Sequence, residues 1–68
     1  MENSVRERRI EKGWTQDELG ERLDVSRQTI NSIERGRYNP SLILAYKLSQ
    51  LFGCTIEQLF DFEKELEK

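Results

Sequence analysis

Hydrogen-bonding side chains are concentrated in one short segment of the chain, Ser26 to Ser32. Arg27 and Gln28 lie near its start, and Asn31 and Ser32 follow one helical turn later. An arginine can donate to O6 and N7 of guanine together, and a glutamine can bond N6 and N7 of adenine. A helix that opens with such side chains fits the major groove of DNA. These four residues are therefore candidates for contacting bases, and the alternative is that they are ordinary surface residues.

The elements that must position these residues are predicted to be helices, since neither a convincing strand nor an internal repeat is visible. Glycines at positions 13, 36 and 53 are placed to end three of the helices. The expected helices run from Val5 to Lys12, from a Thr15 cap to Leu23, from a Ser26 cap to about Arg35, from an Asn39 or Ser41 cap to Phe52, and from a Thr55 cap to Phe60. The charged tail, Asp61 to Lys68, either extends the last helix or frays.

The junction between the second and third helices carries the most specific local signals. Residues 15–18 and 55–58 have the Thr-x-x-Glu and Thr-x-x-Gln spacing of a capping box. Gly20 lies inside a helix, where glycine costs about 1 kcal/mol relative to alanine. We therefore expect another helix to approach closely there, with Ile30 as its partner. Asp24 stands in the turn, where left-handed backbone is needed and aspartate tolerates it better than most residues.

The spacing of these residues resembles the phage-repressor and Cro-type (XRE-like) helix-turn-helix family. The residues that carry the resemblance are Thr15-Gln16, Leu19-Gly20, Leu23, Val25-Ser26, Ile30, Glu34, Gly36, Pro40, Gly53-Cys54-Thr55-Ile56 and Leu59-Phe60. The resemblance covers roughly residues 5 to 60. It implies an all-α, lambda-repressor-like domain of five helices, with a helix-turn-helix formed by the second and third. It also implies a sequence-specific regulator of transcription. The chain departs from the family at Asp24, often a glycine, and at Trp14, more usually aliphatic.

The resemblance implies further roles for individual residues. Gln16 matches a phosphate-contacting glutamine, although it could merely fill a solvated first turn. The residues expected to contact the DNA backbone are Gln16, Ser26, Thr29, Arg35, Arg37, Tyr38 and Asn39. Thr29 could instead touch a thymine methyl group, and Tyr38 could pack beside Pro40. Similar proteins also pair an arginine of the first helix with the acidic residue shortly before the glycine that here is Gly36. Arg9 and Glu34 are therefore expected to form a partly buried, structural ion pair.

Apolar residues near the end of the chain predict a homodimer. A core stripe of Leu42, Ala45, Leu48 and Phe52 would suffice for a monomer. The residues expected to remain for a dimer interface are Leu44, Leu51, Phe60 and Phe62. The alternative is that these four complete a thin core. A two-fold dimer would place two recognition helices about 34 Å apart, and its target would be a palindromic operator.

Length and charge set the outer limits of the interpretation. The chain has 68 residues, which predicts one domain at most: residues 1–68, with a core over 5–60 and a charged tail over 61–68. Its net charge is −2. Residues 26–38 nevertheless carry three arginines against one glutamate, whereas residues 41–68 carry three lysines against five acids. Because the local field decides where DNA binds, the acidic end is expected to lie away from it.

Several other classes of function are disfavoured. The sequence has no histidine, no phosphate-binding glycine loop and no cluster of metal ligands, so we expect neither an enzyme nor a cofactor or metal site. No apolar run approaches the roughly 20 residues that cross a bilayer. The lone Cys54 indicates a reducing, cytoplasmic setting and is either a small buried residue or a redox sensor. The competing function is a protein-interaction adaptor or antitoxin-like module that uses the tail from Glu63 to Lys68 against a protein partner.

Overall fold

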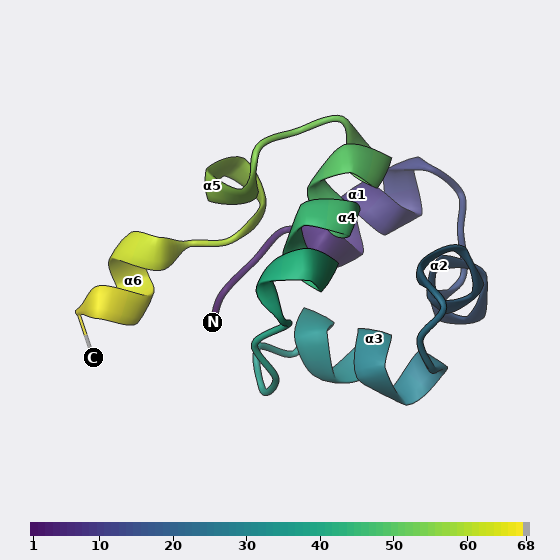
Figure 1. Ribbon diagram of the computed structural model, residues 1–68, viewed down its shortest axis with the longest axis horizontal. Coiled ribbons are helices and arrows are strands. Elements are labelled where there is room, and N and C mark those ends of the chain that lie inside the picture. Colours follow the sequence, from purple (N-terminus) through teal and green to yellow (C-terminus); the bar gives the residue numbers. More distant parts are fainter. Residues whose placement is uncertain (68) are drawn as a thin grey trace.

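The computed structural model describes residues 1–67, and those residues form helices joined by short loops (Figure 1). The helices are α1 (Val5–Glu11), α2 (Gln16–Leu23), α3 (Arg27–Glu34), α4 (Leu42–Phe52), α5 (Ile56–Leu59) and α6 (Phe62–Leu66). The predicted all-α fold is therefore confirmed, but the described residues contain one helix more than expected. Phe60 adopts extended backbone, with φ −118° and ψ 136°, and so ends α5. Asp61 then caps a separate helix in the tail.

Side-chain caps fix the starts of α2, α3, α4 and α5 at positions that the sequence predicted. Thr15 accepts a hydrogen bond from the backbone N–H of Glu18, and the Glu18 carboxylate accepts one from the backbone N–H of Thr15. Thr55 and Gln58 form the same reciprocal pair at the start of α5. Ser41, rather than Asn39, caps α4 by accepting from Leu44. These bonds satisfy backbone donors that the first turn of a helix leaves free.

The turn between α2 and α3 is as tight as Gly20 predicted, but the group that packs closely on Gly20 is not the expected one. Asp24 has the expected left-handed backbone, with φ 58° and ψ 43°. A Cβ atom added to Gly20 would lie 2.6 Å from the carbonyl oxygen of Val25. The close approach is therefore made by backbone of the turn, and the expectation that Ile30 would be the partner is wrong. Ile30 instead lies fully buried in the core.

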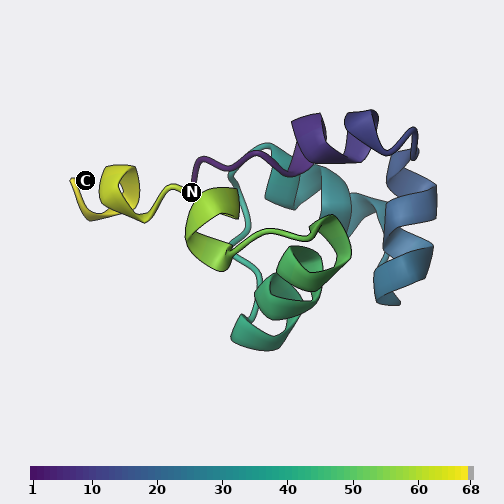
Figure 2. The ribbon, with the colours of Figure 1, turned by 90° about the horizontal axis from the view of Figure 1, so that it is seen from above.

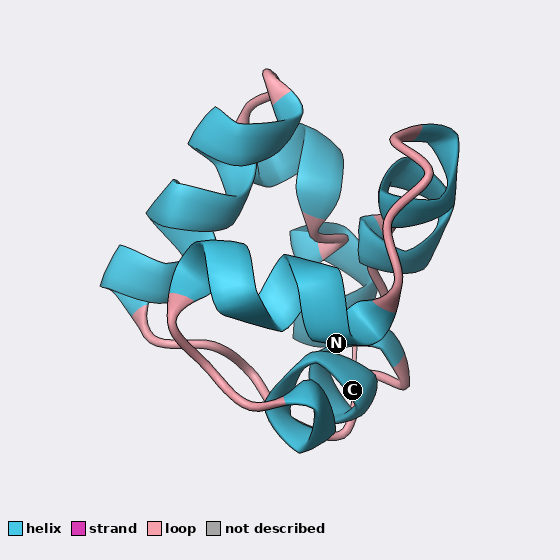
Figure 3. Cartoon of the chain, turned by 90° about the vertical axis from the view of Figure 1, so that its right-hand side faces the viewer, coloured by secondary structure: helices cyan, strands magenta, loops and turns pink. Residues whose placement is uncertain are grey.

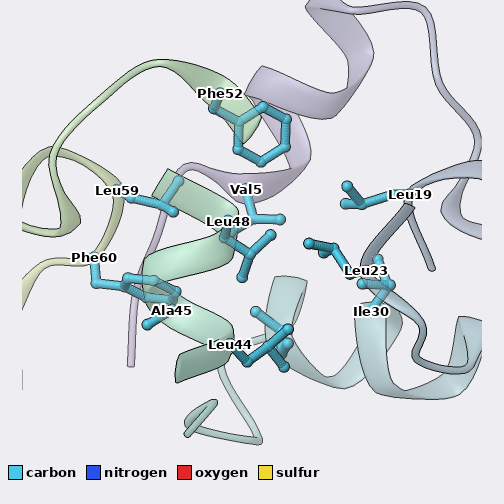
Figure 4. Close-up of a cluster of buried hydrophobic side chains, with 11 residues drawn as sticks. Val5, Leu19, Leu23, Ile30, Leu44, Ala45, Leu48, Phe52, Leu59 and Phe60 are labelled. Carbon is cyan, nitrogen blue, oxygen red and sulfur yellow. The ribbon is translucent and has the colours of Figure 1, made fainter. Parts of the chain in front are cut away.

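The core lies where α1 to α5 meet, and Figure 4 shows its side chains converging from those helices. Its buried members are Val5, Leu19, Leu23, Ile30, Ile33, Leu44, Ala45, Leu48, Phe52, Leu59 and Phe60. Trp14 packs against this core, with its ring centroid 6.1 Å from that of Phe52. The guanidinium carbon of Arg22 lies 4.2 Å from the Trp14 ring centroid, in the range of a cation–π contact.

The burial of side chains on α4 and at the start of the tail differs from what the sequence predicted. Leu44 and Phe60, expected at a dimer interface, are buried within the chain itself. Leu42, expected in the core stripe, is exposed instead. The buried face of α4 runs through 44, 45, 48 and 52, and Leu42, at the first position of the helix, lies at the edge of that face, where it lines an open hollow together with Ala45 and Phe62.

The N-terminal segment runs beside the start of the tail and connects it to α3. The backbone N–H of Ser4 donates to the carbonyl of Leu59, and that of Asp61 donates to the carbonyl of Glu2. The Asn3 side chain donates to the carbonyl of Ile33 over 2.8 Å. Figure 2 shows the result, with α6 projecting at one end of the molecule and α2 at the other. None of the helices in residues 1–67 has the length and apolarity needed to span a membrane.

Candidate nucleic-acid interface

Helix α3 lies on one side of the molecule, and its first turn is held by its own side chains. Figure 3 shows the helices from the side and the short loops that join them. The Ser26 hydroxyl accepts from the backbone N–H of Thr29 over 3.1 Å, and the two hydroxyl oxygens lie 3.0 Å apart. The Thr29 hydroxyl is therefore already engaged in the free protein, while its methyl group is not. A capped first turn keeps the following side chains in a fixed direction.

Five of the predicted contact residues line one open hollow between the start of α2 and α3: Gln16, Arg27, Gln28, Asn31 and Ser32. Arg27 and Gln28 are exposed, whereas Asn31 and Ser32 are half-buried. The hollow thus combines four candidate base-contacting residues with one candidate phosphate contact. Hydrogen-bonding side chains at this spacing on the outer side of a helix can reach base edges in a major groove.

The loop after α3 folds back beside the same side chains. The backbone N–H groups of Arg37 and Tyr38 both donate to the carbonyl of Ser32, over 3.0 and 3.3 Å. Gly36 permits this fold, because its φ of 74° lies in the region that favours glycine. Tyr38 shares a second hollow with Gln28, Thr29 and Ser32. The structure therefore places Tyr38 next to the candidate base contacts.

Three other loop residues are exposed but are not drawn into either hollow: Arg35, Arg37 and Asn39. Two exposed guanidinium groups therefore follow α3 directly. Guanidinium groups are suited to phosphate contacts, which fix orientation on a duplex without reading its sequence.

A buried network behind the hollow joins α1, α2 and α3. The Arg9 guanidinium donates to both carboxylate oxygens of Glu34, with Nε to Oε2 at 2.7 Å and a second bond at 3.3 Å. The side chains of Arg9 and Glu34 are 12% and 3% exposed. Arg9 also donates to the carbonyl of Trp14 over 2.7 Å. The expected structural ion pair is thus present, and it fixes the end of α3 against α1.

The network also contains a contact that the sequence did not predict. The amide nitrogen of Gln16 donates to Oε1 of Glu34 over 3.1 Å. This bond orients the Gln16 side chain and leaves its amide oxygen and a second N–H available. No spacing rule links residues 18 positions apart on different helices, so only the folded structure shows the pair.

An exposed ion pair joins the start of α3 to α2. Nη1 of Arg27 lies 4.0 Å from a carboxylate oxygen of Asp17, and both side chains are largely exposed. Such pairs contribute about 0–1 kcal/mol. Arg27 is therefore only weakly restrained and remains able to turn toward another acceptor.

Comparison with known proteins places this geometry among DNA-binding regulators. A family model described as "Helix-turn-helix" matches residues 5–59. An uncharacterized HTH-type transcriptional regulator of Archaeoglobus fulgidus is 48% identical over 65 residues, which cover 96% of this chain and 93% of the relative. The uncharacterized HTH-type transcriptional regulator YgzD of Bacillus subtilis is 45% identical over 65 residues, covering 96% and 98% of the two chains.

A solved structure is similar in fold as well as in sequence. The restriction-modification controller protein C.AhdI from Aeromonas hydrophila has a TM-score of 0.72 and 32% identity, covering 82% of this chain and 85% of that one. The control protein C.MunI from Mycoplasma sp. is 37% identical over 65 residues, covering 93% of this chain and 88% of the relative.

Proposed function

Because this chain belongs to the helix-turn-helix family of transcriptional regulators, we propose that it is a sequence-specific regulator that binds double-stranded DNA as a homodimer on an inverted repeat. One observation carries the proposal. Four polar residues of α3 and Gln16 of α2 line a single open hollow, and a buried ion pair holds the end of α3 behind it. Repression by occluding the polymerase is the simplest mechanism for such a regulator.

Base recognition is assigned to the outer side of α3. Arg27 would take O6 and N7 of a guanine, and Gln28 would take N6 and N7 of an adenine. Asn31 and Ser32, one turn later, would meet the next bases along the groove. The weak hold of Asp17 on Arg27 supports this assignment, because guanine can replace it at little cost.

Phosphate binding is assigned to residues on both sides of the candidate base contacts of α3. Gln16 stands at the N-terminus of α2, where backbone N–H groups also favour an anion. Arg35, Arg37, Tyr38 and Asn39 would contact the backbone from the loop after α3, and Ser26 and Thr29 from the start of α3. Phosphate contacts flanking the base contacts would set the depth of α3 in the groove.

The dimer is assigned to the outer face of α4 in place of the buried residues first expected there. Leu42, Ile43 and Tyr46 are each more than half exposed, and Phe62 lies beside the Leu42 end of that face. Contiguous exposed apolar side chains on a small domain mark an interaction surface. Of the interface residues predicted from the sequence, the exposed Phe62 and the half-buried Leu51 remain part of the proposal, whereas the buried Leu44 and Phe60 do not.

The function is tested by selecting bound duplexes from a random pool and then titrating the selected duplex with salt. The proposal predicts an enriched inverted repeat and an affinity that falls steeply as salt increases, because neutralised phosphates release counterions. An enriched motif without symmetry would contradict the dimer alone. A protein that enriches no motif and binds no duplex at low salt would contradict the function and favour the adaptor or antitoxin-like alternative.

A further inference from the structure

Helix α6 carries an apolar pair that the rest of the chain covers only in part. Phe62 and Leu66 are four residues apart, so they lie on one face of the helix. Their side chains are 40% and 84% exposed. The backbone N–H of Asp61 donates to the carbonyl of Glu2, and Lys64 forms an ion pair with the Glu2 side chain at 3.2 Å. Glu65 also lies 3.6 Å from the N-terminal ammonium of Met1, so the helix is anchored along one side, while its apolar pair remains partly open.

A groove at the other end of the molecule is apolar at its floor and positively charged at its edge. It runs between the end of α2 and the second half of α4, and it is lined by Arg22, Leu23, Asp24, Tyr46, Lys47, Gln50 and Leu51. Leu23 and Leu51 supply an apolar floor together with the ring of Tyr46. Arg22 and Lys47 are exposed and place two positive charges beside that floor.

We infer that α6 of one copy of this chain seats its apolar pair in the α2–α4 groove of a second copy, and that the second copy does the same in return. This inference rests on the dimer of the proposed function and names the contact that holds it. Charge complementarity selects this occupant. Residues 61–67 carry four acids against one lysine, a net charge of −3. The groove carries Arg22 and Lys47 against the single carboxylate of Asp24.

The arrangement of the elements allows the exchange to close on itself. In Figures 1 and 2, α6 and α2 lie at opposite ends of the longest dimension, which measures 33 Å, and α4 lies between them. A two-fold axis passing the outer face of α4 exchanges the two ends, so each α6 meets the other copy's groove. If that axis points toward the side that carries α3, both recognition helices face the same duplex. Such a contact is isologous and stops at two copies.

The main test measures the self-association constant of the full chain by sedimentation equilibrium. The variant Leu66→Ser should raise the dimer dissociation constant at least tenfold, because two buried leucine side chains are lost from each dimer. Since Leu66 is 84% exposed within one chain, the variant should retain the wild-type helical content. Ile10→Ser is the matched control: Ile10 is also an exposed apolar residue, on α1, and its substitution should leave dimerisation unchanged.

A second test locates the partner of α6 directly. In a Cys54→Ser background, the double variant Leu66→Cys with Gln50→Cys should form covalent dimers on oxidation, whereas Leu66→Cys with Ile10→Cys should not. The inference is overturned if Leu66→Ser dimerises like the wild type, or if the first pair fails to cross-link in a dimeric protein. A wild-type chain that stays monomeric also overturns it. DNA binding is measured separately by the duplex selection, so its failure is distinguishable from these outcomes.

Discussion

Loss of Arg9 should destabilise the protein far more than loss of the complete ion pair. In Arg9→Met the Glu34 carboxylate, 3% exposed, loses its cationic partner. Removing one member of a buried pair costs about 3–5 kcal/mol. Gln16 still donates to Glu34, so we place the loss of unfolding free energy near the lower end, about 3 kcal/mol. For a domain of this size that corresponds to a fall in Tm of about 12–24 °C.

The double variant Arg9→Met with Glu34→Leu separates the charge effect from packing. It replaces both ionic groups by apolar side chains of similar length, and such exchanges are often neutral or stabilising. We therefore expect it to recover most of the stability that Arg9→Met loses. Urea unfolding followed by far-UV circular dichroism, at one fixed protein concentration, measures the wild type, Arg9→Met, Glu34→Leu and the double variant.

Arg6→Met provides the matched control, because Arg6 is exposed on the same helix and should change stability by less than about 0.5 kcal/mol. The reasoning is refuted if Arg9→Met behaves like this control. It is equally refuted if the double variant loses the sum of the two single losses, since that would show no coupling between the two side chains.

The remaining predictions address the turn, a helix cap and the dimer. Gly20→Ala should lose about 1–3 kcal/mol of unfolding free energy despite its better helix propensity, because the added Cβ meets the Val25 carbonyl at 2.6 Å; urea unfolding measures this. Hydrogen bonds from the backbone and side chain of Thr15 lower the pKa of Glu18 below its ordinary value of 4.5. The stability from this group is therefore present above pH 4.5 and lost as the pH falls through the lowered pKa, so Glu18→Gln should lose less stability over that acidic window than the wild type does. Leu42→Asp should give a folded monomer by light scattering, because Leu42 lies on the exposed face of α4; an unchanged mass would place the interface elsewhere.

Local features of the fold could be predicted because each depends on a few neighbouring residues. The capping boxes at Thr15 and Thr55 and the left-handed turn at Asp24 follow from side-chain chemistry within four positions. The common placement of the candidate contact residues of α3 was predictable for the same reason, since one helical turn sets their common face. All of these features are determined by residues that lie close together in the sequence.

Features that depend on how helices rotate against one another were not predictable. The rotation of α4 decides that Leu44 is buried and Leu42 exposed, and both are leucines in an apolar run. The neighbour of Gly20 depends on the path of the turn backbone. The bond between Gln16 and Glu34 requires α2 and α3 to be placed together first. Extended backbone at Phe60, paired with Asn3, separates α6 from α5 in a tail whose sequence is mostly charged.

The central claim is that the outer side of α3 reads base pairs, and Arg27→Ala tests it most directly. Fluorescence anisotropy should be measured on the selected duplex and on duplexes changed at one base pair in each half-site. If Arg27 contacts a base, the variant should lose about 1–3 kcal/mol of binding free energy for each half-site on the selected duplex, with discrimination lost at one position only. An equal loss on every duplex, including unrelated ones, would show that Arg27 meets only phosphate and would contradict the claim.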